Sequence, residues 1–138
     1  MALQDDIVAA LQADATLAGL LPGGIYDAVE ISRTSPETAG AFDENGEILP
    51  CCLVKVETQT TIAPYERGSR EYLALYLYQR FGYDTIRDAA DRIFDLLNRK
   101  KISANVWEIR YASSTPDTRD DALDCSLVLS RYEVIRHR

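Results

Sequence analysis

The 138-residue sequence predicts a single α+β domain over residues 1–138, with a mainly antiparallel sheet of about four to five strands and two helices packed on one face. Two observations lead to this fold class. Apolar residues recur every three to four positions in two segments, as in a helix buried on one side, and alternate with polar residues in several others, as in a half-buried strand. The later strands follow each other in pairs, which favours antiparallel neighbours.

A helix over residues 4–20 is predicted first, because Leu3, Ile7 and Leu11 repeat at helical spacing. The stretch "LLPGG" then stops the helix and allows a tight reversal. "IYDA" follows as a short extended piece. Residues 30–49 are polar and contain a proline, glycines and an Asn-Gly pair, so they are predicted to form a long loop tipped by a small hairpin.

The sheet is predicted from two strand pairs. The strand after Pro50, "CCLVKVETQT", directs Cys52, Val54 and Val56 to one face. Its partner is "REYLALYLYQR", and "TIAPYERGS" at 61–69 is predicted to be the loop between them. Counting by twos in that partner puts Leu73, Leu75 and Leu77 on one side and Tyr72, Ala74, Tyr76, Tyr78 and Arg80 on the other. The last strands are expected at 104–111 and 122–136, separated by the polar turn "ASSTPDTRDD".

The second helix lies between these pairs and begins after "GY", with Asp84 as its expected N-cap. Arg87 and Asp91 stand four residues apart and are expected to form an exposed ion pair. The basic "NRKK" at 98–101 ends the helix, where cations complement the helix dipole. The apolar stripe of this helix comprises Ile86, Ala89, Ala90, Ile93, Phe94 and Leu97.

Composition excludes several classes of protein. A content of 46% hydrophobic and 27% charged residues is ordinary for a globular domain and excludes a disordered scaffold. The longest apolar runs are far shorter than the roughly 20 residues of a membrane span, and the first residues lack the pattern of a signal peptide, so we expect a cytoplasmic protein with no membrane partner. A net charge of −7 disfavours binding to phosphate backbones.

Residues that carry catalysis are not apparent in the sequence. The single histidine, His137, is next to the last residue, and no base accompanies the three cysteines, which we interpret as small buried hydrophobic side chains. Their number and spacing favour neither disulfides nor zinc. We find no glycine-rich phosphate loop between a strand and a helix, and the acidic stretches lack the ligand pattern of a calcium loop. We therefore expect no enzyme activity, no metal and no cofactor.

The tyrosine side of the second strand poses the main functional question. A second protein layer such as the first helix, another copy of the chain, or stacked bases of a nucleic acid could cover the rings. Nucleic acid is disfavoured because only Arg70 and Arg80 flank the rings in an acidic chain. Contact with another subunit is favoured, because tyrosine combines an apolar face with a polar hydroxyl. The predicted subunit interface is Tyr72, Tyr76, Tyr78 and Arg80.

Several stretches together resemble the tail-terminator, or tail-completion, proteins of long-tailed bacteriophages and gene-transfer particles. They are the opening "DDIVAALQADATLAGLL" followed by "PGGIYDA", the proline-led strand "LPCCLVKVE", a strand and helix pair, and the closing "DALDCSLVLSRYEVI". The resemblance covers most of the chain. One difference is that the segment between Asp27 and Pro50 is longer than is common in that family.

The resemblance implies a non-enzymatic virion protein of the tail and neck, assembled in the host cytoplasm. It implies a ring, expected to be hexameric, that caps the tail tube, joins it to the head connector and lets DNA pass through its lumen without specific binding. Two loops, 30–49 and 61–69, would reach the tube and the connector, through Arg33, Phe42, Glu44, Tyr65 and Arg67. The alternatives left open are another neck component and a small-molecule-binding accessory domain.

Overall fold

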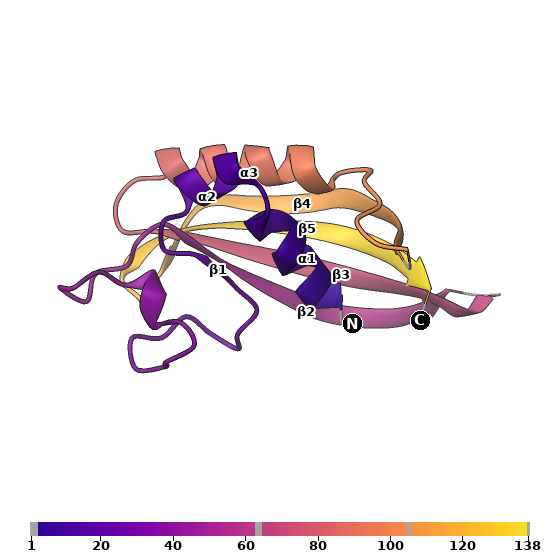
Figure 1. The fold of residues 1–138 in the computed structure, drawn as a ribbon, viewed down its shortest axis with the longest axis horizontal. Helices are drawn as coiled ribbons and strands as arrows, with labels where there is room; N and C mark the ends of the chain where they lie inside the picture. Colours follow the sequence, from indigo (N-terminus) through magenta and orange to yellow (C-terminus); the bar gives the residue numbers. More distant parts are fainter. Residues whose placement is uncertain (1–2, 63–64, 105, 138) are drawn as a thin grey trace.

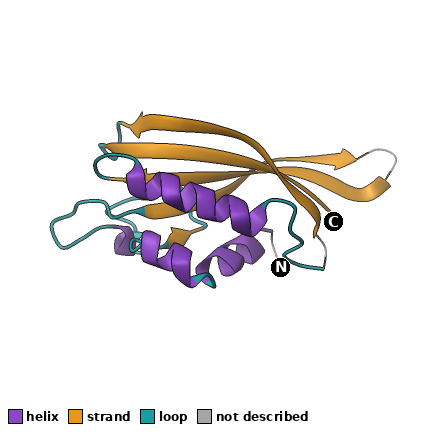
Figure 2. Ribbon diagram, turned by 90° about the horizontal axis from the view of Figure 1, so that it is seen from above, coloured by secondary structure: helices purple, strands orange, loops and turns teal. Residues whose placement is uncertain are grey.

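A computed structural model describes residues 3–62, 65–104 and 106–137, with the side chains of 58–67, 116 and 137 outside the description. It confirms the α+β fold: one five-stranded sheet, in the order β1-β2-β3-β5-β4, carries the α-helices as a layer on one face (Figure 1; Figure 2). The helices are α1 (Leu3–Gln12), α2 (Ala15–Leu20) and α3 (Asp84–Leu97). The strands are β1 (Ile25–Tyr26), β2 (Cys51–Ile62), β3 (Tyr65–Gln79), β4 (Val106–Asp120) and β5 (Cys125–His137).

The first predicted helix is in fact two helices, because the chain breaks after Gln12 and restarts at Ala15. Asp14 has extended backbone angles there, and its Oδ2 accepts a hydrogen bond from the Leu17 backbone N–H at 2.9 Å, so it caps α2. The same carboxylate receives two hydrogen bonds from the Arg92 guanidinium on α3, at 2.7 and 2.9 Å. Asp14 therefore starts α2 and ties it to α3, roles that spacing alone does not reveal.

We expect this contact to make the fold sensitive to acid. The Arg92 hydrogen bonds, followed by the Leu17 N–H, lower the pKa of Asp14 from 3.8 to about 2. A carboxylate with a lowered folded-state pKa contributes stability above its unfolded pKa, and that stability is lost as pH falls through the folded value. Asp14→Asn retains a good capping residue but removes the charge. The free energy of unfolding by urea should therefore fall less between pH 4 and pH 2 in this variant than in the wild type.

The control for this prediction is Asp5→Asn, which changes an exposed aspartate on α1. It should keep the wild-type slope of stability against pH over the same interval. An Asp14→Asn profile that runs parallel to the wild-type profile from pH 4 to pH 2 would contradict the assigned role of the Arg92 contact.

The second predicted helix is present as α3, with three differences in detail. Asp84 lies in its first turn, and the Gln79 side chain, which donates to Asp84 Oδ1 at 2.7 Å, accepts from the Ile86 N–H at 3.1 Å. Arg87 is paired with Asp117 of β4, not with Asp91. Phe94, assigned to the apolar stripe, is 40% exposed, whereas Ile86, Ala89, Ile93 and Leu97 are buried. Arg87 thus takes a partner 30 residues away in the sequence in place of its neighbour on the same helix.

The strands extend further than their apolar patterns indicate. The predicted loop 61–69 is largely strand, since β2 and β3 pair antiparallel up to Ile62 and Tyr65, and this hairpin projects past the helix layer (Figure 2). The predicted turn "ASSTPDTRDD" is likewise the second half of β4. Register shifts at 111/113 and 115/118 accommodate it, and Asp117 takes a positive φ of 54°. Polar residues in these stretches therefore lie on paired strands, not in loops.

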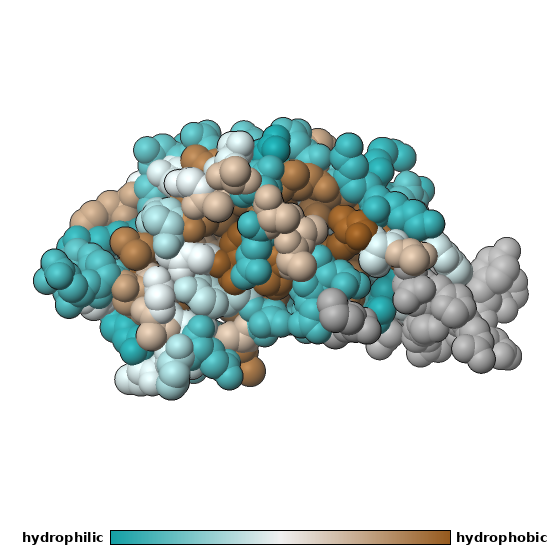
Figure 3. All heavy atoms as spheres, viewed as in Figure 1, coloured by the Kyte–Doolittle hydropathy of each residue, from teal (hydrophilic) through white to brown (hydrophobic). Residues whose placement is uncertain are grey.

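The main core lies between the helices and the sheet. Figure 3 shows hydrophobic residues gathered around α1 on this side, with mostly hydrophilic residues along α3. The predicted inward side of β3, Leu73, Leu75 and Leu77, is fully buried here, as are Cys52 and Val54 of β2. Ile7 and Leu11 of α1, Leu17 of α2, the buried stripe of α3, and Ile109, Val128, Tyr132 and Val134 of the later strands complete it.

A second, smaller core lies on the opposite face at one end of the sheet. The long loop, residues 27–50, folds beneath that end while α3 lies above it (Figure 1). It contains a 3-10 turn at Ala39–Ala41 and, as expected, a hairpin-like tip closed by the bridge between Phe42 and Ile48. Its side chains Ile31, Ala41 and Ile48 pack on Cys51, Leu53, Tyr78 and Cys125 of the sheet.

Candidate subunit interface

The tyrosine-bearing face of the sheet is divided into a covered end and an open end. The long loop covers Tyr78 and Leu53 at the covered end. The alternation of the paired strands places a second set of side chains on the open end, which no described helix covers; we call it the open face. It comprises Lys55 and Glu57 of β2, Arg70, Tyr72 and Tyr76 of β3, and Leu129, Arg131, Glu133 and Ile135 of β5.

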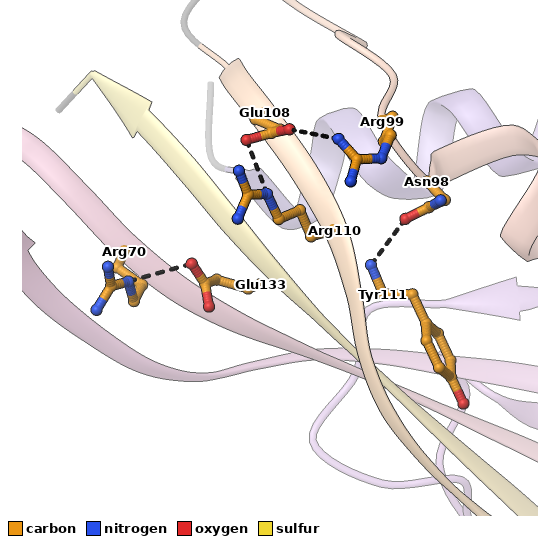
Figure 4. Close-up of polar contacts among 7 residues, drawn as sticks. All are labelled: Arg70, Asn98, Arg99, Glu108, Arg110, Tyr111 and Glu133. Carbon is orange, nitrogen blue, oxygen red and sulfur yellow. Dashed lines mark hydrogen bonds and ion pairs between the residues drawn. The ribbon is translucent and has the colours of Figure 1, made fainter.

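Ion pairs between strands, one of them reaching across β3, hold the side chains of the open face in place. Arg131 Nε lies 3.3 Å from Glu57 Oε2, and Arg70 Nε lies 3.2 Å from Glu133 Oε1. Figure 4 shows the second of these pairs beside Glu108, which accepts from Arg110 on the same strand. Such exposed pairs contribute little stability each, about 0–1 kcal/mol. Their effect is to fix the pattern of charge on this face.

The half-buried Tyr76 ring lies in the middle of this pattern. Its hydroxyl donates to Glu57 Oε1 at 3.4 Å, and the Lys55 ammonium lies 5.9 Å from the ring centroid. Burial, followed by the charge of Glu57 and the hydrogen bond to it, raises the pKa of the Tyr76 phenol. The ring therefore stays neutral at physiological pH and presents an apolar surface edged by polar groups, which suits contact with protein.

The structure separates the four residues of the predicted interface. Tyr72 and Tyr76 lie half-buried on the open face. Tyr78 is only 5% exposed, and the chain's own loop covers it, so the expectation that another subunit or the first helix hides this ring is wrong. Arg80 is exposed but pairs with Glu47 of that loop and stacks 4.6 Å from the Phe81 ring centroid. The alternation along β3 was sufficient to group these side chains, but not to show that the loop returns beneath them.

The structure describes the side chains of three of the five loop residues that were predicted to contact the tube or the connector. Arg33 and Phe42 come together at the loop tip, with the guanidinium 5.0 Å from the ring centroid and its Nε donating to the Gly46 carbonyl at 2.7 Å. Glu44 is exposed on the same tip. The side chains of Tyr65 and Arg67 lie outside the described residues. The tip is thus a braced structure that carries an exposed charge.

The outer edge of β4 carries contacts that the sequence reasoning missed. The Asn98 Oδ1 accepts from the Tyr111 backbone N–H at 2.9 Å (Figure 4). The Arg99 N–H donates to the Ile109 carbonyl at 2.7 Å. Further along, the Tyr83 hydroxyl donates to the Thr118 carbonyl at 2.8 Å. Because the flanks of α3 occupy these edge groups, a neighbouring strand cannot extend the sheet along this part of β4.

The cysteines are free and buried, as their pattern predicted. Burial, with a contribution from the neighbouring thiol, raises the pKa of Cys51 to about 12, and burial raises that of Cys125 to about 11. Neither thiol is therefore activated as a nucleophile.

Within the described residues, no group of three or more His, Cys, Asp or Glu is placed to hold a metal ion, and no helix is long and apolar enough to cross a membrane.

Comparison with known proteins shows a likeness in fold. No protein-family model and no curated protein matches this sequence. Among solved structures, a chain described as "Virion of native gene transfer agent (GTA) particle" matches with a TM-score of 0.69 and 17% sequence identity. The match covers 99% of this chain and 96% of that chain. The two chains share a fold. The likeness extends over the helix layer, the sheet and the loop together.

Proposed function

We propose that this chain is a structural virion protein, a tail terminator that forms a ring, six copies in our proposal, to cap a tail tube and join it to a head connector. The observation that carries this proposal is the likeness over nearly the full length of both chains to a component of a gene transfer agent virion. The sequence resemblance to tail-terminator proteins supports the same role. The braced loop tip with Arg33 and Glu44 supplies a surface that could contact the tube or the connector.

The open face supports assembly of the chain with copies of itself. In a closed ring, one patch of each copy contacts a different patch of the next copy. Because hydrogen bonds already occupy part of the outer edge of β4, contact through the faces of the sheet is favoured over a sheet that continues from one copy into the next. Light scattering measures the mass of the assembly, and negative-stain images show whether it is annular. Addition of the protein to a polymerising tail tube should stop growth at a defined end. A different neck component would bind the connector without stopping the tube.

Tyr76→Asp is expected to abolish ring assembly and leave a folded monomer. An added carboxylate beside Glu57 would place two like charges at the centre of the open face. We expect at least about tenfold weaker assembly by light scattering, with a change in unfolding free energy within about 1 kcal/mol because the ring is only half-buried. Assembly by this variant at wild-type concentrations would contradict the assigned interface.

Glu44→Gln is the matched control, since it changes one charge on the loop tip away from the open face. It should assemble like the wild type. Arg80→Glu is a poorer probe, because it also breaks the ion pair with Glu47 that ties the long loop to the end of β3.

A further inference from the structure

A groove lies on the helix-bearing side, between α3 and the strands β4 and β5. It has a volume of about 320 Å³ and is lined by three aromatic rings, those of Phe94, Tyr111 and Tyr132, together with Asp91, Ala90 and two serines. The rings are locked edge to face, with Tyr111 5.6 Å from both Phe94 and Tyr132 between centroids. Phe94 is 40% and Tyr111 43% exposed, so two aromatic faces are available at the mouth of the groove.

The rim of this groove on α3 is strongly acidic. Asp84, Asp88, Asp91 and Asp95 are spaced four, three and four residues apart, which places them along one side of the helix. The arginines of the same helix form their ion pairs outside this row, Arg87 with Asp117 and Arg92 with Asp14, and their charges also act on Asp84 and Asp95, so Asp88 and Asp91 are the carboxylates of this side that they affect least. Like charges at this spacing destabilise a helix by tenths of a kcal/mol per pair. Burial, then the charges of Tyr111, Asp91 and Asp95, raise the pKa of Tyr132, which places both carboxylates near the groove.

Aromatic faces beside carboxylates suit a cationic side chain. A lysine can lay its aliphatic stem against the rings, with the ammonium attracted both by the ring faces and by Asp91. A cation from another molecule would also relieve the repulsion between the carboxylates. The chemistry of the groove therefore indicates an ammonium or guanidinium group as its occupant.

Few described cationic side chains of a neighbouring copy are available to enter this groove. Every described arginine except Arg33 forms an ion pair, and Arg33 is held at the loop tip by the Gly46 carbonyl and the Phe42 ring, so the three lysines are the remaining described cations. Lys100 and Lys101 follow Asn98 and Arg99, which bond the edge of β4 that carries Tyr111, so a contact through these lysines would join the same edge of two copies about a two-fold axis. Lys55 lies on the open face, the opposite side of the sheet. A contact between opposite sides repeats head to tail, which is what a closed ring requires.

We infer that the groove of one copy receives the open face of the next copy, with Lys55 entering between the aromatic rings and the carboxylates of Asp91 and Asp95. This inference rests on the proposed ring. It identifies the two patches of the subunit contact and explains why Lys55 and Tyr76 lie together on a face that the chain's own helices leave uncovered.

Charge reversal tests the contact. Lys55→Glu and the double variant Asp91→Lys/Asp95→Lys should each weaken assembly by at least about tenfold, as measured by light scattering. An equimolar mixture of the two variants, in which each patch meets an opposite charge on the other, should recover association. Lys100→Glu/Lys101→Glu should assemble like the wild type. Circular dichroism checks that every variant is folded, which we expect because these side chains lie on the surface.

A cross-link between engineered cysteines decides the geometry even when assembly is weak. The native cysteines are fully buried, so a bismaleimide reagent addresses only introduced ones. A Lys55→Cys copy mixed with an Asp95→Cys copy should cross-link, and neither variant should cross-link to itself. Cross-linking of Lys101→Cys to Asp95→Cys instead would overturn the head-to-tail contact in favour of the two-fold pair. An assembling wild type with unaffected variants overturns this inference alone, whereas a monomeric wild type without cross-links overturns the ring as well.

Discussion

Tyr78→Ala is expected to lower the free energy of unfolding by about 3–5 kcal/mol, the range measured when a large buried ring is removed. Tyr78 is 5% exposed and lies between Cys51, Leu53 and the loop residues Ile31 and Ile48. Because this ring forms the floor on which the loop packs, its loss should also free residues 27–50 from the sheet. Urea unfolding measures the stability, and limited proteolysis followed by mass spectrometry should find new cleavage within that segment.

Tyr76→Ala is the matched control, since the same change is made two residues earlier on the same face of the same strand. Removal of this half-buried ring should lower the free energy of unfolding by less than about 1.5 kcal/mol and leave the loop resistant to protease. Equal losses for the two variants would show that the long loop does not form the second core, and that Tyr78 is not distinguished from the other tyrosines of β3.

Arg136→Leu is expected to destabilise the fold by about 3–5 kcal/mol, because it leaves a buried carboxylate without its counter-charge. Glu71 is only 2% exposed, on the helix-bearing side of β3, and its Oε1 accepts from Arg136 Nη2 on β5 at 2.9 Å. The second oxygen of Glu71, the Nε of Arg136 and the Ser69 hydroxyl have no hydrogen-bond partner among the described residues. A pair with so little further support is poorly compensated for its desolvation.

The double variant Glu71→Leu/Arg136→Leu should recover most of the stability lost by Arg136→Leu alone, because it removes both charges and fills the space with apolar groups. The Arg70–Glu133 pair provides a control, since Arg70→Leu breaks an exposed contact on the opposite face and should cost about 1 kcal/mol or less. A double variant that is less stable than Arg136→Leu would show that the buried pair is net stabilising.

The helices and the inner side of β3 were largely predictable from the sequence. Ile86, Ala89, Ile93 and Leu97 recur at helical spacing, and burial of all four follows from that pattern. The break at Asp14 was not predictable, because apolar residues continue through it at nearly helical spacing. Two contacts of Asp14 hold the break, the cap on the Leu17 N–H and the ion pair with Arg92, 78 residues away, and the apolar periodicity reports neither.

The hydrophilic parts of β2, β3 and β4 were interpreted as loops because strands are recognised by alternating apolar residues. In "ASSTPDTRDD" the strand has no such pattern, because its side chains Ala112, Ser113 and Ser114 are exposed. Pairing with β5, with contacts from Tyr83 and Arg87 to Thr118 and Asp117, keeps this segment extended, and bulges accommodate the irregular spacing. The prediction of the interface had the same limit. Alternation placed the tyrosines on one face of the strand, but it did not show that the long loop covers Tyr78.

The sequence by itself determined the class of fold, the buried sides of α3 and β3, the burial of the cysteines and the grouping of Tyr72, Tyr76 and Tyr78 on one face. These features follow from residues close together in the chain, where periodicity and turn chemistry act. Only the tertiary structure decided that the loop covers Tyr78 and leaves Tyr76 open, and that Phe94, Tyr111 and Tyr132 line one groove. Those outcomes depend on contacts between segments far apart in the sequence, whose packing and ion pairs no local pattern specifies.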